Sequence, residues 1–214
     1  MASTRSLVAV SAGLQVPSST RLLADRLVAA TERHLRDAGT DPLTTVIELR
    51  DHAQDLSNNL LTGFPSPTLQ TAIDQVTGAD GLIVASPIFN ASYSGLFKTF
   101  FDVIEHDSLD GRPVLLAATG GTARHSLALE HSLRPLFTYL GADTVRTAVY
   151  AAAEDWGRSG VPADGSLVQR IDRAASELAG AIAVREPHAR HEAFADPEPF
   201  EQMLRDLEPH QPGD

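Results

Sequence analysis

Three hydroxyl side chains follow a glycine turn near the start of the chain. The stretch VSAGLQVPSST, residues 10–20, interrupts an apolar run and leads into a long amphipathic segment. A turn that delivers the chain into a helix N-terminus exposes unpaired backbone N–H groups and the positive end of the helix dipole, which together attract an anion. Ser18, Ser19 and Thr20 add hydroxyl donors there. The stretch predicts a phosphate site, although a simple helix cap explains Ser18 equally well.

This stretch matches neither of the common nucleotide-binding motifs. It has neither the lysine of the Walker pattern nor the three spaced glycines of the dinucleotide-binding pattern. Gly13 and Pro17 shape the turn under either interpretation. A phosphate bound here would be held by amides and hydroxyls, without a lysine.

A second stretch, SPIFNASYSGLFKTFFD at residues 86–102, runs from an apolar segment straight into a proline. It places an aromatic ring and an amide where the apolar segment ends. Large apolar groups at such an edge usually have something to cover, and a planar heterocycle fits. Ordinary packing of the aromatic ring under a loop is the alternative. The candidate residues are Pro87, Ile88, Phe89 and Asn90.

A third stretch, ATGGTARH at residues 118–125, also follows an apolar segment directly. Paired glycines let the backbone approach a ligand closely and offer amides to the edge of a flat ring. A flexible connection is the alternative for this stretch, and a histidine that caps or orients the loop is the simpler explanation of His125. Taken together, a phosphate site, an aromatic surface for a flat ring and amides for the edge of that ring describe a site for flavin mononucleotide (FMN).

Five apolar, β-branched-rich runs predict the strands that position these loops, and their continuous apolar character indicates cover on both faces. Segments with helical periodicity lie between them, and Gly39 and Gly141 are suitable C-terminal caps. Strict alternation predicts a flavodoxin-like α/β fold, a doubly wound five-stranded parallel sheet with helices on both faces and ligands at the carboxyl ends of the strands. The expected strands are 6–11, 44–49, 81–86, 113–119 and 144–151; the expected helices are 19–39, 66–79, 94–106, 125–141 and 166–184.

Composition narrows the class of protein. The 214 residues, 43% of them hydrophobic, suffice for one well-cored domain. Because cysteine is missing, disulfides, thiolate metal sites, iron-sulfur clusters and cysteine nucleophiles are excluded. A net charge of −11 opposes binding to nucleic acid or anionic lipid. No apolar window is long enough for a membrane span, so we expect a soluble, cytoplasmic protein.

The chain divides into a domain at residues 1–184 and a tail at residues 185–214 that is rich in Pro, Glu and His. A proline-interrupted acidic tail cannot bury enough surface to fold alone. Its stretch PFEQMLRDL has apolar residues at helical spacing, which leaves two alternatives: a frayed tail, or a short helix that docks on a partner subunit. The two histidines of HARH have no third ligand, so we do not expect a metal site.

The three stretches resemble the NADPH-dependent FMN reductase family, especially members that supply reduced flavin to two-component monooxygenases. The resemblance rests on VSAGLQVPSST, SPIFNASYSGLFKTFFD and ATGGTARHSLALEHSLRPLFTYLGA and covers residues 6–152. It implies a flavodoxin-like fold, FMN held by the three loops, NAD(P)H as hydride donor, a partner monooxygenase and a homodimer or homotetramer.

The resemblance also implies roles for individual residues. Phosphate contacts fall on Ser11, Ser18, Ser19 and Thr20. Pro87, Ile88, Phe89 and Asn90 would line the flavin ring and ribityl chain, and Thr119, Gly120 and Gly121 would bond its pyrimidine edge, with His125 close behind. The chain departs from the family at Gln15, which replaces a usual arginine, and at Phe89, where many relatives have tyrosine.

The implied chemistry is hydride transfer from nicotinamide C4 to flavin N5, for which the protein supplies stacking, orientation and electrostatics. This reaction requires no nucleophile or catalytic triad. A quinone or azo-compound reductase on the same scaffold is one alternative. A non-enzymatic electron carrier of the flavodoxin type is another, favoured by the acidic charge but not by the first loop, which lacks the T-x-T-G-x-T form. A flavin-binding redox sensor is a third.

Overall fold

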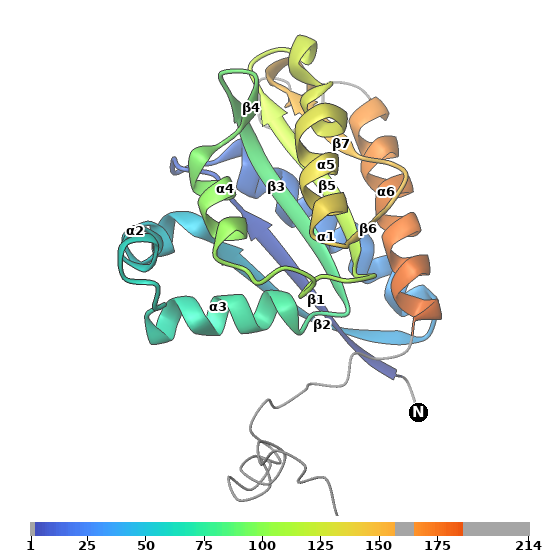
Figure 1. The fold of residues 1–214 in the computed structure, drawn as a ribbon. Coiled ribbons are helices and arrows are strands. Elements are labelled where there is room, and N and C mark those ends of the chain that lie inside the picture. Colours follow the sequence, from blue (N-terminus) through green and yellow to red (C-terminus); the bar gives the residue numbers. More distant parts are fainter. Residues whose placement is uncertain (1–2, 157–164, 186–214) are drawn as a thin grey trace, which may run out of the picture.

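A parallel β-sheet forms the centre of the molecule (Figure 1). In the computed structural model, which describes residues 3–156 and 165–185, the strand order is β2-β1-β3-β5, and both β6 and β7 pair with β5. The order reverses beside β1, which is where open sheets of this kind bind ligands. The strands are β1 (Ser3–Ser11), β2 (Thr40–Glu48), β3 (Gly81–Phe89), β4 (Ser92–Tyr93), β5 (Pro113–Gly120), β6 (Asp143–Thr144) and β7 (Val149–Ala152).

Helices cover both faces of this sheet. Helices α1 and α6 pack side by side on one face, and α2, α3, α4 and α5 cover the other (Figure 1). The helices are α1 (Ser19–Asp37), α2 (Ala53–Thr62), α3 (Pro67–Thr77), α4 (Gly95–Asp102), α5 (Arg134–Tyr139) and α6 (Gly165–Val184); the shorter helical turns are η1 (Leu49–His52), η2 (Ala123–His125), η3 (Leu129–Leu133, π-helical) and η4 (Ala153–Trp156).

The core consists of two apolar layers, one on each face. Along β1, Leu7 and Ala9 belong to the layer under α1 and α6, while Val8 and Val10 belong to the layer under the other helices. Successive strand side chains point to opposite faces, so a strand buried on both faces must be apolar throughout. This confirms the predicted doubly wound arrangement.

The predicted helix caps are also found. Gly39 and Gly141 both have φ of +77°, a left-handed conformation that glycine adopts without steric cost. At the N-termini, the side chains of Ser18, Ser66 and Ser94 accept hydrogen bonds from the first turns of α1, α3 and α4. These caps fix where the chain leaves and re-enters the layers.

In the part of the chain that the structure describes, the sheet has seven strands, where the sequence predicted five. One extra strand is β4, which forms a short antiparallel hairpin with β3. The other arises because the predicted strand at 144–151 is split into β6 and β7. Between them, Arg134 donates to the carbonyls of Val145 (3.2 Å) and Arg146 (3.3 Å), and Glu177 accepts from the backbone N–H of Thr147 (2.7 Å). These side chains satisfy backbone groups that a continuous strand would pair with β5.

The helices differ from the prediction in two places, one helix that was predicted wrongly and one that was not predicted. The single helix expected at 125–141 is instead a succession of η2, η3 and α5. Pro135 lies in the first turn of α5, and because proline has no N–H it cannot continue a helical ladder from the preceding turn. Helix α2 was not predicted, because only Leu56 among its apolar residues is buried. The predicted tail at 185–214 lies outside the described residues, except for Arg185.

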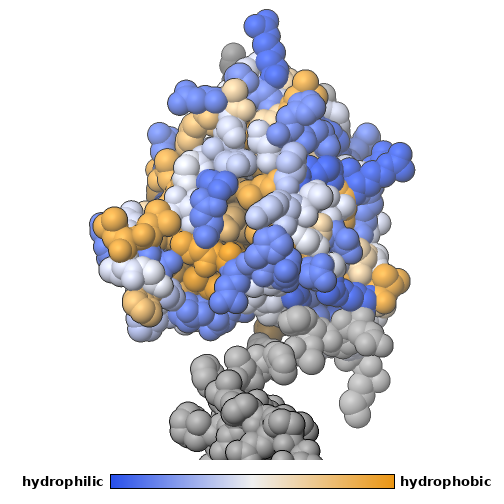
Figure 2. All heavy atoms as spheres, viewed as in Figure 1, coloured by the Kyte–Doolittle hydropathy of each residue, from blue (hydrophilic) through white to orange (hydrophobic). Residues whose placement is uncertain are grey.

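One helix presents apolar side chains to solvent. Figure 2 shows an apolar patch over α2, at the left of the view. Leu60, Leu61 and Phe64, on α2 and just after it, are 58%, 87% and 80% exposed. Among the described helices, none is long and apolar enough to cross a membrane.

Candidate functional site

The three loops singled out in the sequence meet at one rim of the sheet. They follow β1, β3 and β5, which are adjacent and parallel, so their carboxyl ends lie at the same edge. Ser11 at the end of β1 is opposite Ala85 of β3, and Pro87 of β3 is opposite Thr119 of β5. The backbone N–H of Ala12 also donates to the carbonyl of Ala85 at 2.9 Å. The common rim that the sequence predicted is therefore present.

The first loop is folded tightly over the N-terminus of α1. Ser18 is the N-cap, and its hydroxyl accepts from the N–H of Arg21 at 3.2 Å. A Cβ on Gly13 would lie 2.0 Å from the Ser18 Oγ, so only glycine leaves room for this cap. Ser11 is 1% exposed, and its hydroxyl has no hydrogen-bond partner among residues 3–156 and 165–185. A buried hydroxyl without a partner is costly unless a ligand or water satisfies it.

The three consecutive hydroxyls of this loop do not point the same way. Ser19 is exposed, Ser18 is half-buried and Thr20 is 2% exposed. The Thr20 hydroxyl lies 2.7 Å from that of Thr119, at the end of β5. This buried contact ties the first loop to the third. One of the two hydroxyls spends its hydrogen on this bond, so only the other has a hydrogen left for a ligand.

The second loop is a tight hairpin between β3 and β4. Its two turn residues, Asn90 and Ala91, have φ of 49° and 67°, which is the left-handed region. The hydroxyl of Ser86 accepts from the N–H of Ser94 (3.0 Å) and donates to the carbonyl of Pro87 (2.9 Å), which closes the base of the hairpin. Phe89, at the end of β3, is 48% exposed. The hairpin thus presents an aromatic face at the rim on a fixed backbone.

The other residues predicted around this hairpin have different environments. Pro87 and Ile88 are buried at the end of β3, whereas Asn90 is exposed. Lys98 and Asp102, one turn apart on α4, form a surface ion pair with one another. The hairpin therefore offers the exposed Phe89 and Asn90 directly to a ligand, with Pro87 and Ile88 behind them.

The third loop is packed on one side and open on the other. A Cβ on Gly120 would lie 2.1 Å from the hydroxyl oxygen of Tyr150, whereas a Cβ on Gly121 would meet nothing within 4 Å. The Tyr150 hydroxyl donates to the carbonyl of Thr122 at 2.9 Å. His125 is exposed, and its backbone N–H donates to the same carbonyl at 3.4 Å. Gly121 and His125 therefore lie on the solvent side of this turn.

The residues at the rim fit FMN. The hydroxyl of Ser11 at the end of β1 and the N-terminus of α1, to which the first loop leads, suit a phosphate, since a helix N-terminus attracts negative charge. The exposed face of Phe89 and the open side of Gly121 suit a flat ring that has one polar edge. The loop after β1 therefore offers groups for the phosphate, the loop after β3 offers a surface for the ring face, and the loop after β5 offers backbone groups for the ring edge.

Sequence reasoning missed two residues that shape the rim. Ser86 lies in an apolar run, where a serine gave no signal of its role in the hairpin. Tyr150 was assigned only to a strand. A tyrosine in a buried strand must find a partner for its hydroxyl, and this was the one signal that could have marked it.

The strand order, the helices on both faces and the site at the reversal of that order define a flavodoxin-like α/β protein. The chain belongs to the NADPH-dependent FMN reductase family, which matches residues 6–157. The match spans all three loops of the rim.

Curated proteins and solved structures are similar over most of their length. An FMN reductase (NADPH) of Pseudomonas aeruginosa is 41% identical over 180 residues, covering 84% of this chain and 93% of that protein. The NADH-dependent FMN reductase SfnF of Pseudomonas putida is 36% identical over 167 residues, covering 77% of this chain and 88% of that protein.

Two crystal structures have the same fold. An oxidoreductase from Corynebacterium diphtheriae superimposes with a TM-score of 0.81 at 42% identity, covering 86% of this chain and 99% of that one. The apo form of the NADH:FMN oxidoreductase EMOB superimposes with a TM-score of 0.74 at 28% identity, covering 88% of this chain and 96% of that one. The flavodoxin-like fold predicted from the sequence is confirmed.

Proposed function

We propose that this chain is a flavin reductase that transfers hydride from NADPH or NADH to FMN at the carboxyl edge of the sheet. The observation that carries the proposal is that the loops after β1, β3 and β5 meet at one rim, where the buried hydroxyl of Ser11, at the end of β1, has no hydrogen-bond partner among the described residues. The family supports it. The named relatives use NADPH in one case and NADH in another, so both donors belong to the proposal.

In this proposal, the FMN phosphate is held by the N-terminus of α1 and by nearby hydroxyls. The ring rests on the β3–β4 hairpin, and its pyrimidine edge bonds the third loop. The phosphate residues are Ser11, Ser18, Ser19 and Thr20; the ring residues are Pro87, Ile88, Phe89 and Asn90; the edge residues are Thr119, Gly120, Gly121 and His125. For Thr119 we propose the backbone as the contacting group, with its hydroxyl donating to that of Thr20, which leaves the hydrogen of Thr20 for a phosphate oxygen.

When bound, FMN supplies the hydride acceptor and the nicotinamide supplies the hydride. The residues of the chain bind and orient these two reactants. Phe89 presents an exposed aromatic face at the rim, and the hydrogen-bonded hairpin keeps that face in position. The open side of the third loop, at Gly121, leaves room for a second ring to approach. Correct stacking of two rings accounts for much of the acceleration in a reaction of this kind.

Visible spectroscopy and steady-state kinetics test this function. We expect the purified protein to bind FMN and to oxidise NADPH or NADH only when FMN is present. Parallel assays with quinones and azo dyes separate a flavin reductase from other reductases on this scaffold. Tight binding of FMN without any oxidation of NADPH or NADH would instead indicate an electron carrier and would contradict the proposal.

The ring-edge assignment has its own test at Gly121. Valine at this position adds a branched side chain on the open side of the turn, where its Cβ meets no protein atom within 4 Å. We expect the fold to be preserved and the Kd for FMN, measured by flavin fluorescence quenching, to rise at least about tenfold, which corresponds to about 1.4 kcal/mol. Gly120 is a poorer probe, because a Cβ there points toward Tyr150, 2.1 Å from its hydroxyl oxygen, and not toward the open side of the turn. An unchanged Kd in Gly121→Val would remove the third loop from the site.

Release of the product belongs to the same proposal. The ring side of the rim is exposed at Phe89 and Gly121, which favours a flavin that leaves after reduction and reaches a partner monooxygenase. Turnover of a flavin-dependent monooxygenase kept behind a dialysis membrane tests this release. We also propose a cytoplasmic location, since NADPH and NADH are intracellular reductants.

We further propose a homodimer or homotetramer. The exposed apolar group at Leu60, Leu61 and Phe64 supports an interface on α2, because apolar patches of this kind often mark interaction surfaces. Light scattering during size-exclusion chromatography measures the assembly, and a monomer at micromolar concentration would contradict it. The domain boundary at residue 184, with a tail at 185–214, remains a prediction.

A further inference from the structure

Tyr150 lies beneath the turn that follows β5. It belongs to β7, which pairs with β5, and its side chain is 5% exposed. Its hydroxyl donates a hydrogen bond of 2.9 Å to the carbonyl of Thr122. A buried phenol requires such a partner, and here the partner is the backbone of the loop to which we assign the ring edge of FMN.

Gly120 and Tyr150 fit one another closely. A Cβ at position 120 would lie 2.1 Å from the Tyr150 hydroxyl oxygen and 3.2 Å from its Cζ. The phenol therefore occupies the space that a side chain on Gly120 would need. On the far side of the same turn, a Cβ on Gly121 would meet no atom within 4 Å. The side chain of Tyr150 therefore supports the turn from the protein interior, whereas the backbone of Gly121 faces solvent.

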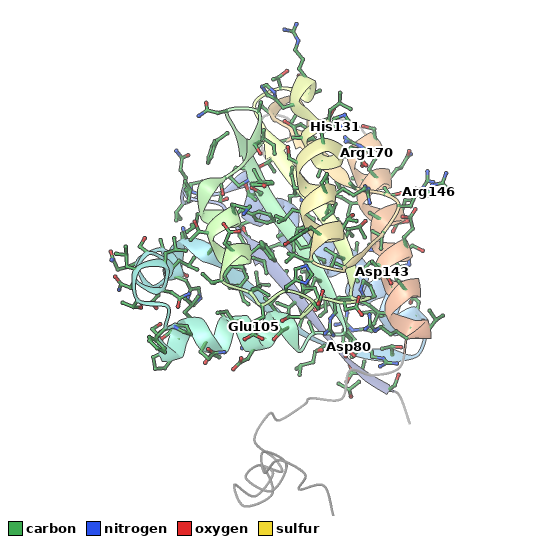
Figure 3. All side chains as sticks on the ribbon, viewed as in Figure 1. Asp80, Glu105, His131, Asp143, Arg146 and Arg170 are labelled. Atoms are coloured by element: carbon green, nitrogen blue, oxygen red, sulfur yellow. The ribbon has the colours of Figure 1, made fainter. Side chains whose placement is uncertain are left out.

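The backbone of β7 is itself fixed from behind. Arg170 of α6 donates to the carbonyl of Tyr150 at 2.6 Å and to the carboxylate of Asp155 at 2.8 Å. The other oxygen of Asp155 accepts the N–H of Ala152 at 2.7 Å. Figure 3 labels Arg170 toward the upper end of α6, whereas Asp80 is labelled at the opposite end of the molecule. The phenol thus projects from a strand that cannot easily shift.

We propose that Tyr150 is a positioning residue for FMN, whose hydroxyl holds the Thr122 carbonyl inward so that the backbone of Gly120 and Gly121 faces the ring edge. This inference rests on the proposed FMN site. Burial raises the pKa of Tyr150, and the charges of Asp155 and Glu154 raise it further, so the phenol remains a donor at neutral pH. Tyr150 acts through the loop and need not touch the flavin.

Removal of one hydroxyl tests the inference. Tyr150→Phe keeps the ring and deletes only the donor to Thr122. We expect the Kd values for FMN and for riboflavin to rise by the same factor, about 3- to 10-fold, because the loss is at the ring edge and not at the phosphate. The KM for FMN should rise while the KM for the nicotinamide does not change, and the visible spectrum of bound FMN should shift. Tyr139→Phe is the matched control, because Tyr139 is 69% exposed near the end of α5.

A double-mutant cycle with Gly120 tests the contact itself. Gly120→Ala places a Cβ against the hydroxyl, so we expect it to weaken FMN binding more than tenfold in the parent chain. In the Tyr150→Phe background the hydroxyl is gone and the nearest tyrosine atom that remains is Cζ at 3.2 Å. The same alanine should then cost less than about twofold. Thermal unfolding without flavin should show the same non-additivity.

The outcomes separate this inference from the proposed function. A parent chain that neither binds FMN nor oxidises NADPH or NADH would refute the function, while the unfolding cycle would still report the contact. If the parent chain is an active reductase and Tyr150→Phe leaves the Kd and the spectrum of FMN unchanged, the inference is overturned, even if the variant is less stable. Additive losses in the double-mutant cycle would also overturn it.

Discussion

Valine at position 20 probes the contact that ties the first loop of the rim to the third. The hydroxyls of Thr20 and Thr119 are 2.7 Å apart, and the two residues are only 2% and 3% exposed. Thr20→Val keeps the shape of the side chain but leaves the Thr119 hydroxyl buried without a partner. Such a group costs about 1–3 kcal/mol. At about 2–4 °C per kcal/mol for a chain of this size, we expect Tm to fall by roughly 2–12 °C.

The double variant supplies the sharper measurement. When both threonines become valine, no hydroxyl is left unsatisfied, and replacing both partners by apolar groups of the same shape is nearly neutral. Because each single variant leaves one buried hydroxyl unsatisfied and the double variant leaves none, urea unfolding of the parent, both single variants and the double variant should give a coupling free energy of about 2–6 kcal/mol. If the two single losses simply add, the hydroxyls are not bonded to one another and the tie between the loops is wrong.

Flavin binding by the same double variant separates stability from function. If the Thr20 hydroxyl also serves the phosphate, as we propose, stability returns in the double variant while the Kd for FMN stays raised by about 3- to 10-fold. Riboflavin has no phosphate, so its Kd should match that of the parent chain. Fluorescence quenching with the two flavins measures both values. Equal behaviour of FMN and riboflavin would remove Thr20 from the phosphate site.

Three further predictions concern other parts of the chain. Ser18→Ala removes the cap of α1, so we expect a loss of about 1 kcal/mol in urea unfolding and a greater loss of affinity for FMN than for riboflavin. A hydrogen bond from His34, together with the nearby Arg33, lowers the pKa of Asp172. Stability from a carboxylate with a lowered pKa is present above its ordinary pKa and is lost as the pH falls through the lowered value. Asp172→Asn should therefore cost a fraction of 1 kcal/mol at pH 7, and this cost should shrink progressively as the pH falls below about 3.9, by urea titration over this range. Burial lowers the pKa of Arg112 to about 10, and its guanidinium donates to backbone carbonyls at the end of α3 and just after it, at the edge of the sheet opposite the rim. Arg112→Met should cost about 2–4 kcal/mol in unfolding and leave the Kd for FMN unchanged.

The sheet and its two apolar layers could be predicted from the sequence because they depend on local periodicity. Strands buried on both faces are apolar throughout, and the helices between them show an apolar stripe. Helix α2 escaped prediction because a single buried leucine, Leu56, leaves no stripe to detect. The split of the last strand depends on Arg134 and Glu177, which come from other elements. The sequence of residues 144–151 gives no indication of these two contacts.

The rim could be predicted for a similar reason. Parallel neighbouring strands must end at the same edge, so loops after β1, β3 and β5 meet without any knowledge of side chains. The contacts that join the loops could not be predicted. Thr20 meets Thr119 and Gly120 meets Tyr150 only after the sheet has formed, and nothing in the sequence of one partner points to the other. Sequence therefore located the site but not the side chains that hold it in shape.

The hairpin beside Phe89 has a consequence for attempts to engineer this protein. Ala91 has a side chain and yet sits at φ 67°, an arrangement that costs an alanine about 1–2 kcal/mol and a glycine nothing. Laboratory evolution for heat resistance should accordingly find glycine at this position early. The gain would come at the tip of the hairpin, without any change to the aromatic surface that it displays.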